Sequence, residues 1–426
     1  MKPMKIAIYN HGIAFDGNTP SQRPLGGSES GIVYMARELA ACGHSVSVYC
    51  NCPEPGMFEG VSYVHYHQFF THYQAMPWDA VIAFRSFDPL LLGRIAPRMI
   101  YWTGDASNQP ALGNFGHAAL QQNVDLVFCV SRWHRDSFIR EFGLTPEKVV
   151  ATRNGFPSDS VVTSGPRDNS SSAYTSTPFR GLDILLNVFP AIRRRVPSAT
   201  LDVFSSMKVY GWTAEQDHQA YGAIYNAANQ PGVTLKGSVN QRQLLRTLGK
   251  TGLLLYPNTF EETSCIAAIE AQASGCVVVT SAKAALKETV AHQETGILVE
   301  GDPRSAEYQR YFIEAAVGLM TNPELFARFS TRARERANRQ YSWRAIAAEW
   351  TNILYDMPAQ QVSGRFTGPL SLIERAWSYL RAGNTNAAQR ILKDVDATPF
   401  FRQETEGLKE RLKSGSQELV SVHGGA

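Results

Sequence analysis

The 426-residue sequence lacks most features of membrane-spanning, secreted or nucleic-acid-binding proteins. No uninterrupted apolar run approaches the roughly 18 residues of a membrane-spanning helix. The opening stretch, MKPMKIAIYNHG, turns polar too early for a signal peptide and predicts a first strand. The net charge of +3 is too small to indicate nucleic acid as a partner. We therefore expect a cytoplasmic protein, and peripheral association with the inner face of a membrane stays open.

Cysteine and metal-binding motifs are equally scarce. The six cysteines show no disulfide-framework spacing, and Cys50 with Cys52 is too sparse for a metal site. No carboxylate or cysteine completes a metal-binding spacing with His65, His67 and His72. P-loop and Gly-x-Ser-x-Gly motifs are absent, which gives a kinase or hydrolase no support. We expect neither a metal nor a cofactor.

What the sequence does contain is a repeated alternation of strand and helix patterns. Hydrophobic residues make up 44% and charged residues 19%, as in ordinary globular proteins. Alternating strands and helices predict parallel sheets covered on both faces. The predicted strands are KIAIYN, SVSVYCN, DAVIAFR, RMIYWTG, DLVFCVS and KVVATRNG in the first half, and TLDVFSS, VTLKGSV, GLLLYPN, CVVVTSA and GILVEGD in the second.

The chain is too long for one ordinary core, and we predict an α/β protein of two Rossmann-like domains facing across a cleft. The first would span residues 1–160. A Ser-, Thr-, Gly- and Pro-rich stretch at 158–178 predicts a surface linker. The second domain would span 161–357, its last helix crossing back toward the first. Residues 358–426 resemble one tetratricopeptide-like helical hairpin, which must dock on the body or on a protein partner.

The first candidate site is RPLGGSESG, between the first strand and a helix start. Gly26 and Gly27 permit positive φ and close backbone approach, and the helix start offers unpaired N–H groups. This arrangement suits a phosphate or another polar ligand. A plain loop with Ser28 as the N-cap is the alternative, because the full GxGxxG pattern is absent.

The second candidate site is FEETSCIAAIEAQASG, which holds two carboxylates eight positions apart. Glu262 falls in the loop before the predicted helix and Glu270 two turns into it. A buried Glu270 would need strong hydrogen bonds, which a ribose diol could supply. The alternative is a surface glutamate on an amphipathic helix.

The start of this second helix is itself a candidate anion site. We expect Thr263 or Ser264 to be its N-cap. The backbone N–H groups around Ser264, Cys265 and Ile266 would then point to the same place and could hold a diphosphate.

The stretch EETSCIAAIEAQASGCVVVTSAKAALKETVAHQETGILVEGD resembles the Glu-x7-Glu signature of retaining glycosyltransferases of the GT-B fold, family 4. Glu262 and Glu270 match the two acids. The segments GGSES, VSRWHRDSFIREFG, KVVATRNGF and RGLDILLNVFPAIRRRVPSATLDVF resemble further parts of that family in the same order. The resemblance covers roughly residues 4–355.

The resemblance implies a metal-independent transfer of sugar from a nucleoside-diphosphate sugar to an acceptor hydroxyl, with retention of anomeric configuration. The first domain would bind the acceptor and the second the donor. Glu262 would contact the transferred sugar and Glu270 the ribose. Arg180 stands where the family has a lysine that holds the diphosphate, but Thr175 replaces an arginine of the same clamp.

A second departure lies in YWTGDASNQP. Gly104 stands where many relatives have a histidine near the sugar. Asp105, which follows it, is a second catalytic candidate or else a turn former, and His117 is a weaker substitute for the imidazole. Saccharide, lipid-linked and protein acceptors stay open, as does a role in polysaccharide or glycoconjugate synthesis. The two departures favour one alternative, a non-catalytic GT-B scaffold that uses the helical tail for protein interaction.

Overall fold

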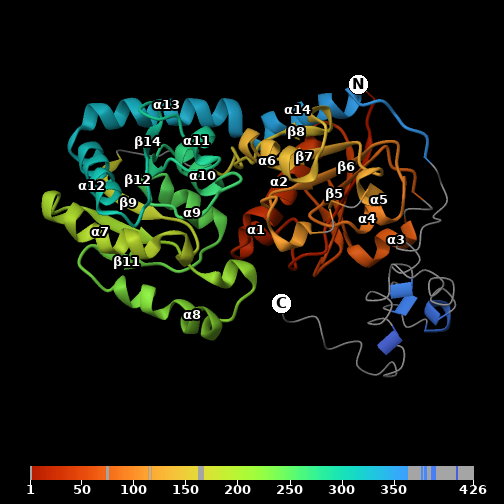
Figure 1. Cartoon of the computed structure of the whole chain (residues 1–426), viewed down its shortest axis with the longest axis horizontal. Helices are drawn as coiled ribbons and strands as arrows, with labels where there is room; N and C mark the ends of the chain where they lie inside the picture. Colours follow the sequence, from red (N-terminus) through yellow and green to blue (C-terminus); the bar gives the residue numbers. More distant parts are fainter. Residues whose placement is uncertain are drawn as a thin grey trace.

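The computed structural model describes residues 2–72, 76–113, 115–116, 118–161 and 167–362, with short helical pieces at 376–377, 379–380, 385–389 and 409–410. Two lobes lie side by side, each with a sheet between helices (Figure 1). The hairpin predicted for the C-terminal tail falls mainly outside the described residues, as does His117. Within the described ranges, no helix has both the length and the apolar character needed to cross a bilayer.

The first lobe contains an eight-stranded sheet in the order β3-β4-β2-β1-β5-β6-β7-β8. Every pairing is parallel except that of β3 with β4. Its strands are β1 (Lys5–Tyr9), β2 (Ser45–Cys50), β3 (Gly56–Phe58), β4 (Val61–His65), β5 (Ala80–Phe84), β6 (Met99–Thr103), β7 (Leu126–Cys129) and β8 (Val149–Ala151). Its α-helices are α1 (Thr19–Gln22), α2 (Gly27–Ala41), α3 (Phe69–His72), α4 (Asp88–Leu91), α5 (Ala118–Gln121) and α6 (Arg132–Phe142).

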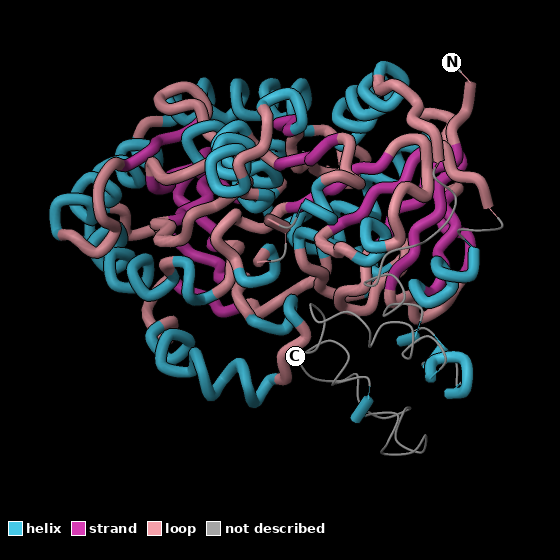
Figure 2. Tube along the Cα trace, turned by 45° about the vertical axis from the view of Figure 1, so that its right-hand side comes forward, coloured by secondary structure: helices cyan, strands magenta, loops and turns pink. Residues whose placement is uncertain are grey.

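The second lobe contains a wholly parallel six-stranded sheet in the order β11-β10-β9-β12-β13-β14, seen with the first as separate groups of strands in Figure 2. Its strands are β9 (Asp168–Tyr174), β10 (Thr200–Val203), β11 (Val233–Leu235), β12 (Thr251–Tyr256), β13 (Val277–Ser281) and β14 (Gly296–Val299). Its α-helices are α7 (Leu182–Arg195), α8 (Ala214–Ala227), α9 (Gln241–Leu248), α10 (Ile266–Ser274), α11 (Leu286–Thr289), α12 (Ala306–Thr321) and α13 (Pro323–Tyr341).

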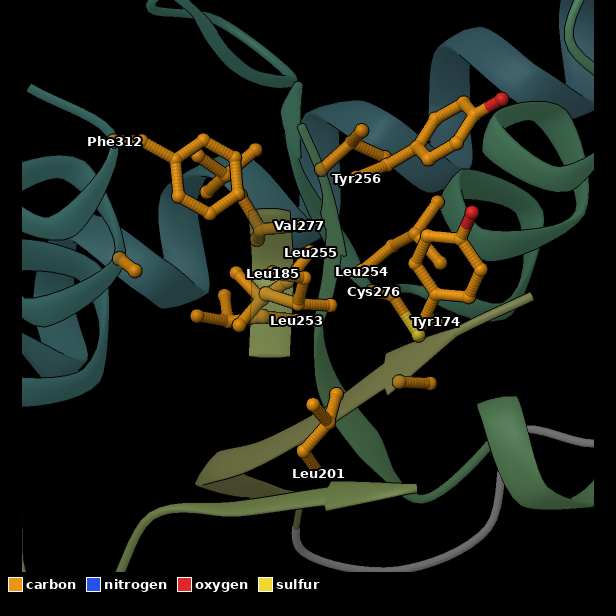
Figure 3. Packing of buried hydrophobic residues seen from close by; sticks show 14 of the residues in the cluster. Tyr174, Leu185, Leu201, Leu253, Leu254, Leu255, Tyr256, Cys276, Val277 and Phe312 are labelled. Carbon is orange, nitrogen blue, oxygen red and sulfur yellow. The ribbon is translucent and has the colours of Figure 1, made fainter. Parts of the chain in front are cut away.

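The α/β architecture and all the strands predicted from the sequence are confirmed. Buried aliphatic strands form the core of the second lobe, where Leu253 and Leu255 of β12 lie among Leu185, Val277 and Phe312 (Figure 3). Such continuous apolar runs are typical of parallel strands buried on both faces.

The surface linker predicted at 158–178 is wrong for most of its length, because β9 occupies part of it at the centre of the second sheet. Serines can line this strand because the neighbouring strands satisfy their hydroxyls. The Ser172 side chain is 2% exposed and donates to the Thr200 carbonyl at 2.6 Å. The Ser171 hydroxyl accepts from the Gly252 N–H at 3.0 Å.

Helix α14 (Trp343–Asp356) follows the second sheet in the chain but packs in the core of the first lobe (Figure 1). Trp350 is fully buried, and its ring meets those of Trp102 and Phe128 edge to face. The indole N–H of Trp350 donates to the Thr152 hydroxyl at 2.6 Å. The chain therefore crosses between the lobes twice.

Both sheets present a switch in strand order to the region between the lobes. In the first sheet β1 lies between β2 and β5, and in the second β9 lies between β10 and β12. Ligands of open parallel sheets bind beyond the carboxyl ends of the strands at such points. The loops after β1, β5 and β6, and after β9 and β12, are therefore the places to examine for a site.

Trp350→Ala should destabilise the first lobe by about 3–5 kcal/mol, because it removes a buried indole and leaves a cavity. Urea unfolding followed by circular dichroism measures the change. Trp212→Ala is the matched control, since the Trp212 side chain is 38% exposed. Equal effects of the two substitutions would show that α14 is not part of the first core.

Candidate active site

The starts of α2 and α10 approach each other closely across the two lobes. A Cβ atom on Gly27, the first residue of α2, would lie 2.8 Å from Cδ1 of Ile266, the first residue of α10. Gly26 has a φ of −62°, so the positive φ predicted for this loop is wrong there. Close approach is what requires glycine, since a Cβ on Gly26 would also lie 2.8 Å from a Glu29 carboxylate oxygen.

The caps predicted for these two helices are wrong. The N-cap residues are Gly26 and Cys265, and neither side chain makes a capping hydrogen bond. Ser28 lies inside α2, and the Thr263 hydroxyl donates instead to the Gly104 carbonyl of the first lobe at 2.6 Å. The backbone N–H groups at the start of α10 therefore keep the partial positive charge that an uncapped helix start carries.

Glu262 lies in the loop after β12, where its side chain is buried and held by two donors. The Tyr256 hydroxyl donates to Glu262 Oε1 at 2.6 Å, and Arg180 Nη1 donates to the same oxygen at 2.8 Å. Burial by itself would lower the pKa of Arg180, but the Glu262 carboxylate more than offsets this and raises it. The guanidinium also lies over the Phe260 ring, 4.3 Å from its centroid. This cation is thus fixed and permanently charged.

The position of Arg180 depends on the glycine that follows it. Gly181 has a φ of +109°, in the left-handed region that favours glycine. A Cβ there would also collide with the Pro257 carbonyl of the loop after β12. The Arg-Gly pair therefore brings the loops after β9 and β12 together, with Arg180 facing Glu262.

Glu270 lies on α10 and is 4% exposed, so the surface alternative for this residue is wrong. Burial raises the pKa of Glu270 to about 7, and a hydrogen bond from Gln241 Nε2 opposes the rise. Its carboxylate is thus a buried acceptor that changes charge near neutral pH.

The first lobe contributes a second group of charges, of which the sequence indicated only Asp105. Arg85 follows β5, and its Nε donates to Asp105 Oδ2 at 2.7 Å. Its Nη1 lies 4.0 Å from Glu29 Oε1. Burial raises the pKa of Glu29, and Arg85 has a φ of +55°, which is unusual for a residue with a side chain. The position of Glu29 beside the glycine loop was a missed signal for this residue; Arg85 had none beyond its place after a strand.

A buried histidine fixes the backbone of Asp105. His134 Nε2 donates to the Asp105 carbonyl at 2.6 Å, while the Val130 N–H donates to His134 Nδ1 at 3.2 Å. Burial lowers the pKa of His134 to about 4, so the ring is neutral and carries its proton on Nε2. The Asp105 side chain is consequently oriented from both ends, by His134 and by Arg85.

The helix that carries His134 is also held by the other lobe. The Glu288 carboxylate of α11 accepts from the backbone N–H groups of Arg132 at 3.0 Å and Trp133 at 2.6 Å, at the start of α6. A carboxylate at a helix start is stabilising. This contact and the bond from Thr263 to Gly104 both link the second lobe to the loop that contains Asp105.

Thr175, which follows β9, is half-buried, and its hydroxyl makes no hydrogen bond. Other cations lie nearby in a cavity of about 550 Å³ between the lobes. Arg23 of the first lobe lines it together with Lys208 and Lys236 of the second. No three His, Cys, Asp or Glu side chains gather at a metal-binding distance anywhere in the described part of the chain.

Glu270→Gln should stabilise the ligand-free protein by up to about 3 kcal/mol at pH 8, and hardly at all at pH 5. Between the ordinary value of 4.5 and about 7, the folded protein keeps a proton that the unfolded chain has lost. The stability that this group contributes therefore falls as pH rises through that window. Thermal melting of both proteins from pH 5 to 8 measures the difference, and a gain that does not depend on pH would contradict the expectation.

Comparison with known proteins agrees with this architecture. Residues 172–320 match the family model for Glycosyl transferases group 1. Over 268 residues the chain is 25% identical to the subunit of phosphatidylinositol N-acetylglucosaminyltransferase that aligns with it from Arabidopsis thaliana. The alignment covers 61% of this chain and 54% of the plant protein, so the chain spans only about half the length of that relative.

Solved structures resemble the chain over most of its length. Sucrose-phosphate synthase from Thermosynechococcus elongatus superposes with a TM-score of 0.64 and 15% identity, covering 82% of this chain and 98% of that one. Anabaena HepE, solved in complex with UDP-glucose, superposes with a TM-score of 0.63 and 15% identity, covering 83% and 100%. The chain therefore has the GT-B fold of these glycosyltransferases, and its second lobe carries a Glycosyl transferases group 1 region.

Proposed function

We propose that the protein is a glycosyltransferase that moves a sugar from a nucleoside-diphosphate sugar to an acceptor hydroxyl, with retention of anomeric configuration. One observation carries the proposal. Two buried carboxylates, Glu262 and Glu270, and the buried cation Arg180 surround the uncapped start of α10 at the switch point of the second sheet. The solved structure of Anabaena HepE with UDP-glucose is consistent with this class of donor.

The donor would lie along α10. Its diphosphate would accept from the backbone N–H groups of Ser264, Cys265 and Ile266, and Arg180 would share its charge with it. The ribose hydroxyls would donate to Glu270, two turns further along. Lys208 and Arg23, which line the cavity between the lobes, would supply the positive charge that Thr175 lacks.

The sugar would lie between Glu262 and the loop of Gly104 and Asp105. As the bond from sugar to phosphate breaks, negative charge grows on the diphosphate and positive charge on the sugar. The helix start and the cations stabilise the first, so a metal ion is not needed for that task. Because Glu262 is engaged by Arg180 and Tyr256, we assign it to hold sugar hydroxyls rather than to attack the anomeric carbon.

Retention then requires that the acceptor attack from the face that the diphosphate leaves. An oxygen of the departing diphosphate would take the acceptor proton, which makes the close carboxylate pair of a retaining glycosidase unnecessary. Asp105 and Glu29 of the first lobe would bind acceptor hydroxyls. We propose a saccharide or lipid-linked acceptor, in polysaccharide or glycoconjugate synthesis at the inner face of a membrane.

A thermal-shift screen of UDP, GDP and ADP and their common sugars should reveal the donor. A ligand at a hundred times its Kd should stabilise the wild type by about 2.7 kcal/mol. The shift should disappear in Glu270→Ala. The absence of any shift in the wild type would favour a non-catalytic scaffold of the same fold.

Glu262→Gln should lower kcat about a hundredfold, because a preorganised group is lost from the reacting centre. The Kd of the nucleoside diphosphate should stay unchanged, since that ligand does not reach the sugar subsite. Release of nucleoside diphosphate from the donor found above, with a panel of saccharide acceptors, measures the rate. Glu261→Gln is the matched control, because this neighbouring carboxylate is exposed. Similar losses in both variants would exclude a specific role for Glu262.

A further inference from the structure

A chain of three side chains connects the first lobe to Glu270. The Tyr34 hydroxyl of α2 donates to Gln241 Oε1, and Gln241 Nε2 donates to Glu270 Oε1. The order of donors is fixed at its two ends. An ionised carboxylate can only accept, so the amide nitrogen must face Glu270 and the amide oxygen is left for the tyrosine.

Each member of this chain is placed by its own element. Gln241 is the first residue of α9, and the Asn240 side chain caps that helix, so the side chain of Gln241 is not used as a cap. Tyr34 is 8% exposed, and the Arg37 guanidinium lies 5.0 Å from its ring centroid. Neither residue belongs to the motifs that indicated the donor site, and α2 belongs to the lobe expected to bind the acceptor.

We propose that Gln241 and Tyr34 are positioning residues of the nucleotide site. Tyr34 holds Gln241, and Gln241 orients the Glu270 carboxylate for the ribose, so that the first lobe takes part in nucleotide recognition. This inference rests on the proposed function, in which Glu270 binds the ribose.

The carboxylate has room for both partners. A carboxylate offers about four lone-pair positions on two oxygens, and Gln241 engages only Oε1. The ribose diol would bind at Oε2. Because the bond from Tyr34 to Gln241 exists only when α2 and α9 are in contact, nucleotide binding and contact between the lobes strengthen each other by linkage.

The charge of Glu270 provides a readout that a merely structural contact would not change. Two titratable groups interact electrostatically with this carboxylate: the Tyr34 hydroxyl of α2 and the Cys265 thiol at the start of α10. Burial raises the pKa of both groups, so both stay neutral near pH 7. Glu270 alone of the three therefore changes charge there, and the hydrogen bond from Gln241 favours its ionised form.

The test is calorimetric titration of the full chain with UDP, GDP and ADP from pH 6 to pH 8.5. Gln241→Leu should bind the preferred nucleotide about tenfold more weakly at pH 7, because a hydrogen bond to a charged group is lost. Its affinity should also rise with pH at a higher midpoint than that of the wild type. Tyr34→Phe should weaken binding about threefold, since a neutral hydrogen bond is lost.

Tyr49→Phe is the matched control, a buried tyrosine of the same lobe whose hydroxyl pairs with His72 Nδ1 at 3.2 Å. Thermal melting confirms that each variant folds. Unchanged affinity and midpoint in Gln241→Leu would overturn the inference and leave the proposed function intact, and tighter binding would show that Gln241 instead competes with the ribose. A wild type that binds none of the three nucleotides would overturn both.

Discussion

The close approach of two helix starts, at Gly27 and Ile266, is the constraint on which the rest of the site depends. Each start carries a partial positive charge, and neither has a side-chain cap. Two such ends facing each other repel unless an anion lies between or beside them. Glu29 partly serves α2, but the start of α10 has no acidic residue in its first turn. The fold thus builds a place for an anion that the described side chains leave unfilled.

The contacts that keep the lobes together also shape the reacting face. Thr263, next to Glu262, binds the Gly104 carbonyl, and Glu288 caps the helix whose His134 holds Asp105. Separation of the lobes would break the first two bonds and release the loop between them. The geometry of the presumed sugar subsite is therefore a property of the closed arrangement, as expected where closure assembles a catalytic site.

Sequence patterns predicted the sheets well, because parallel strands buried on both faces leave long apolar runs. They failed at β9, where Ser171 and Ser172 make hydrogen bonds to neighbouring strands that no local pattern records. They also failed for Thr263, since its hydroxyl has a partner in the other lobe rather than in its own helix. Glu262 and Glu270 could be found because their spacing is local, whereas Arg85 reaches the site only through the order of strands in the sheet.

The groups that cost stability are the ones we assign to function. Burial makes an ionised Glu270 unfavourable, and one amide hydrogen bond from Gln241 only partly compensates. A buried carboxylate with an incomplete set of donors binds a diol more strongly than a saturated one, because the ligand supplies what the protein lacks. Glu262, by contrast, already has Tyr256 and Arg180 as donors, so a sugar must share them. This difference leads us to expect that affinity resides mainly in the nucleotide half of the donor, and selectivity for transfer in the sugar half.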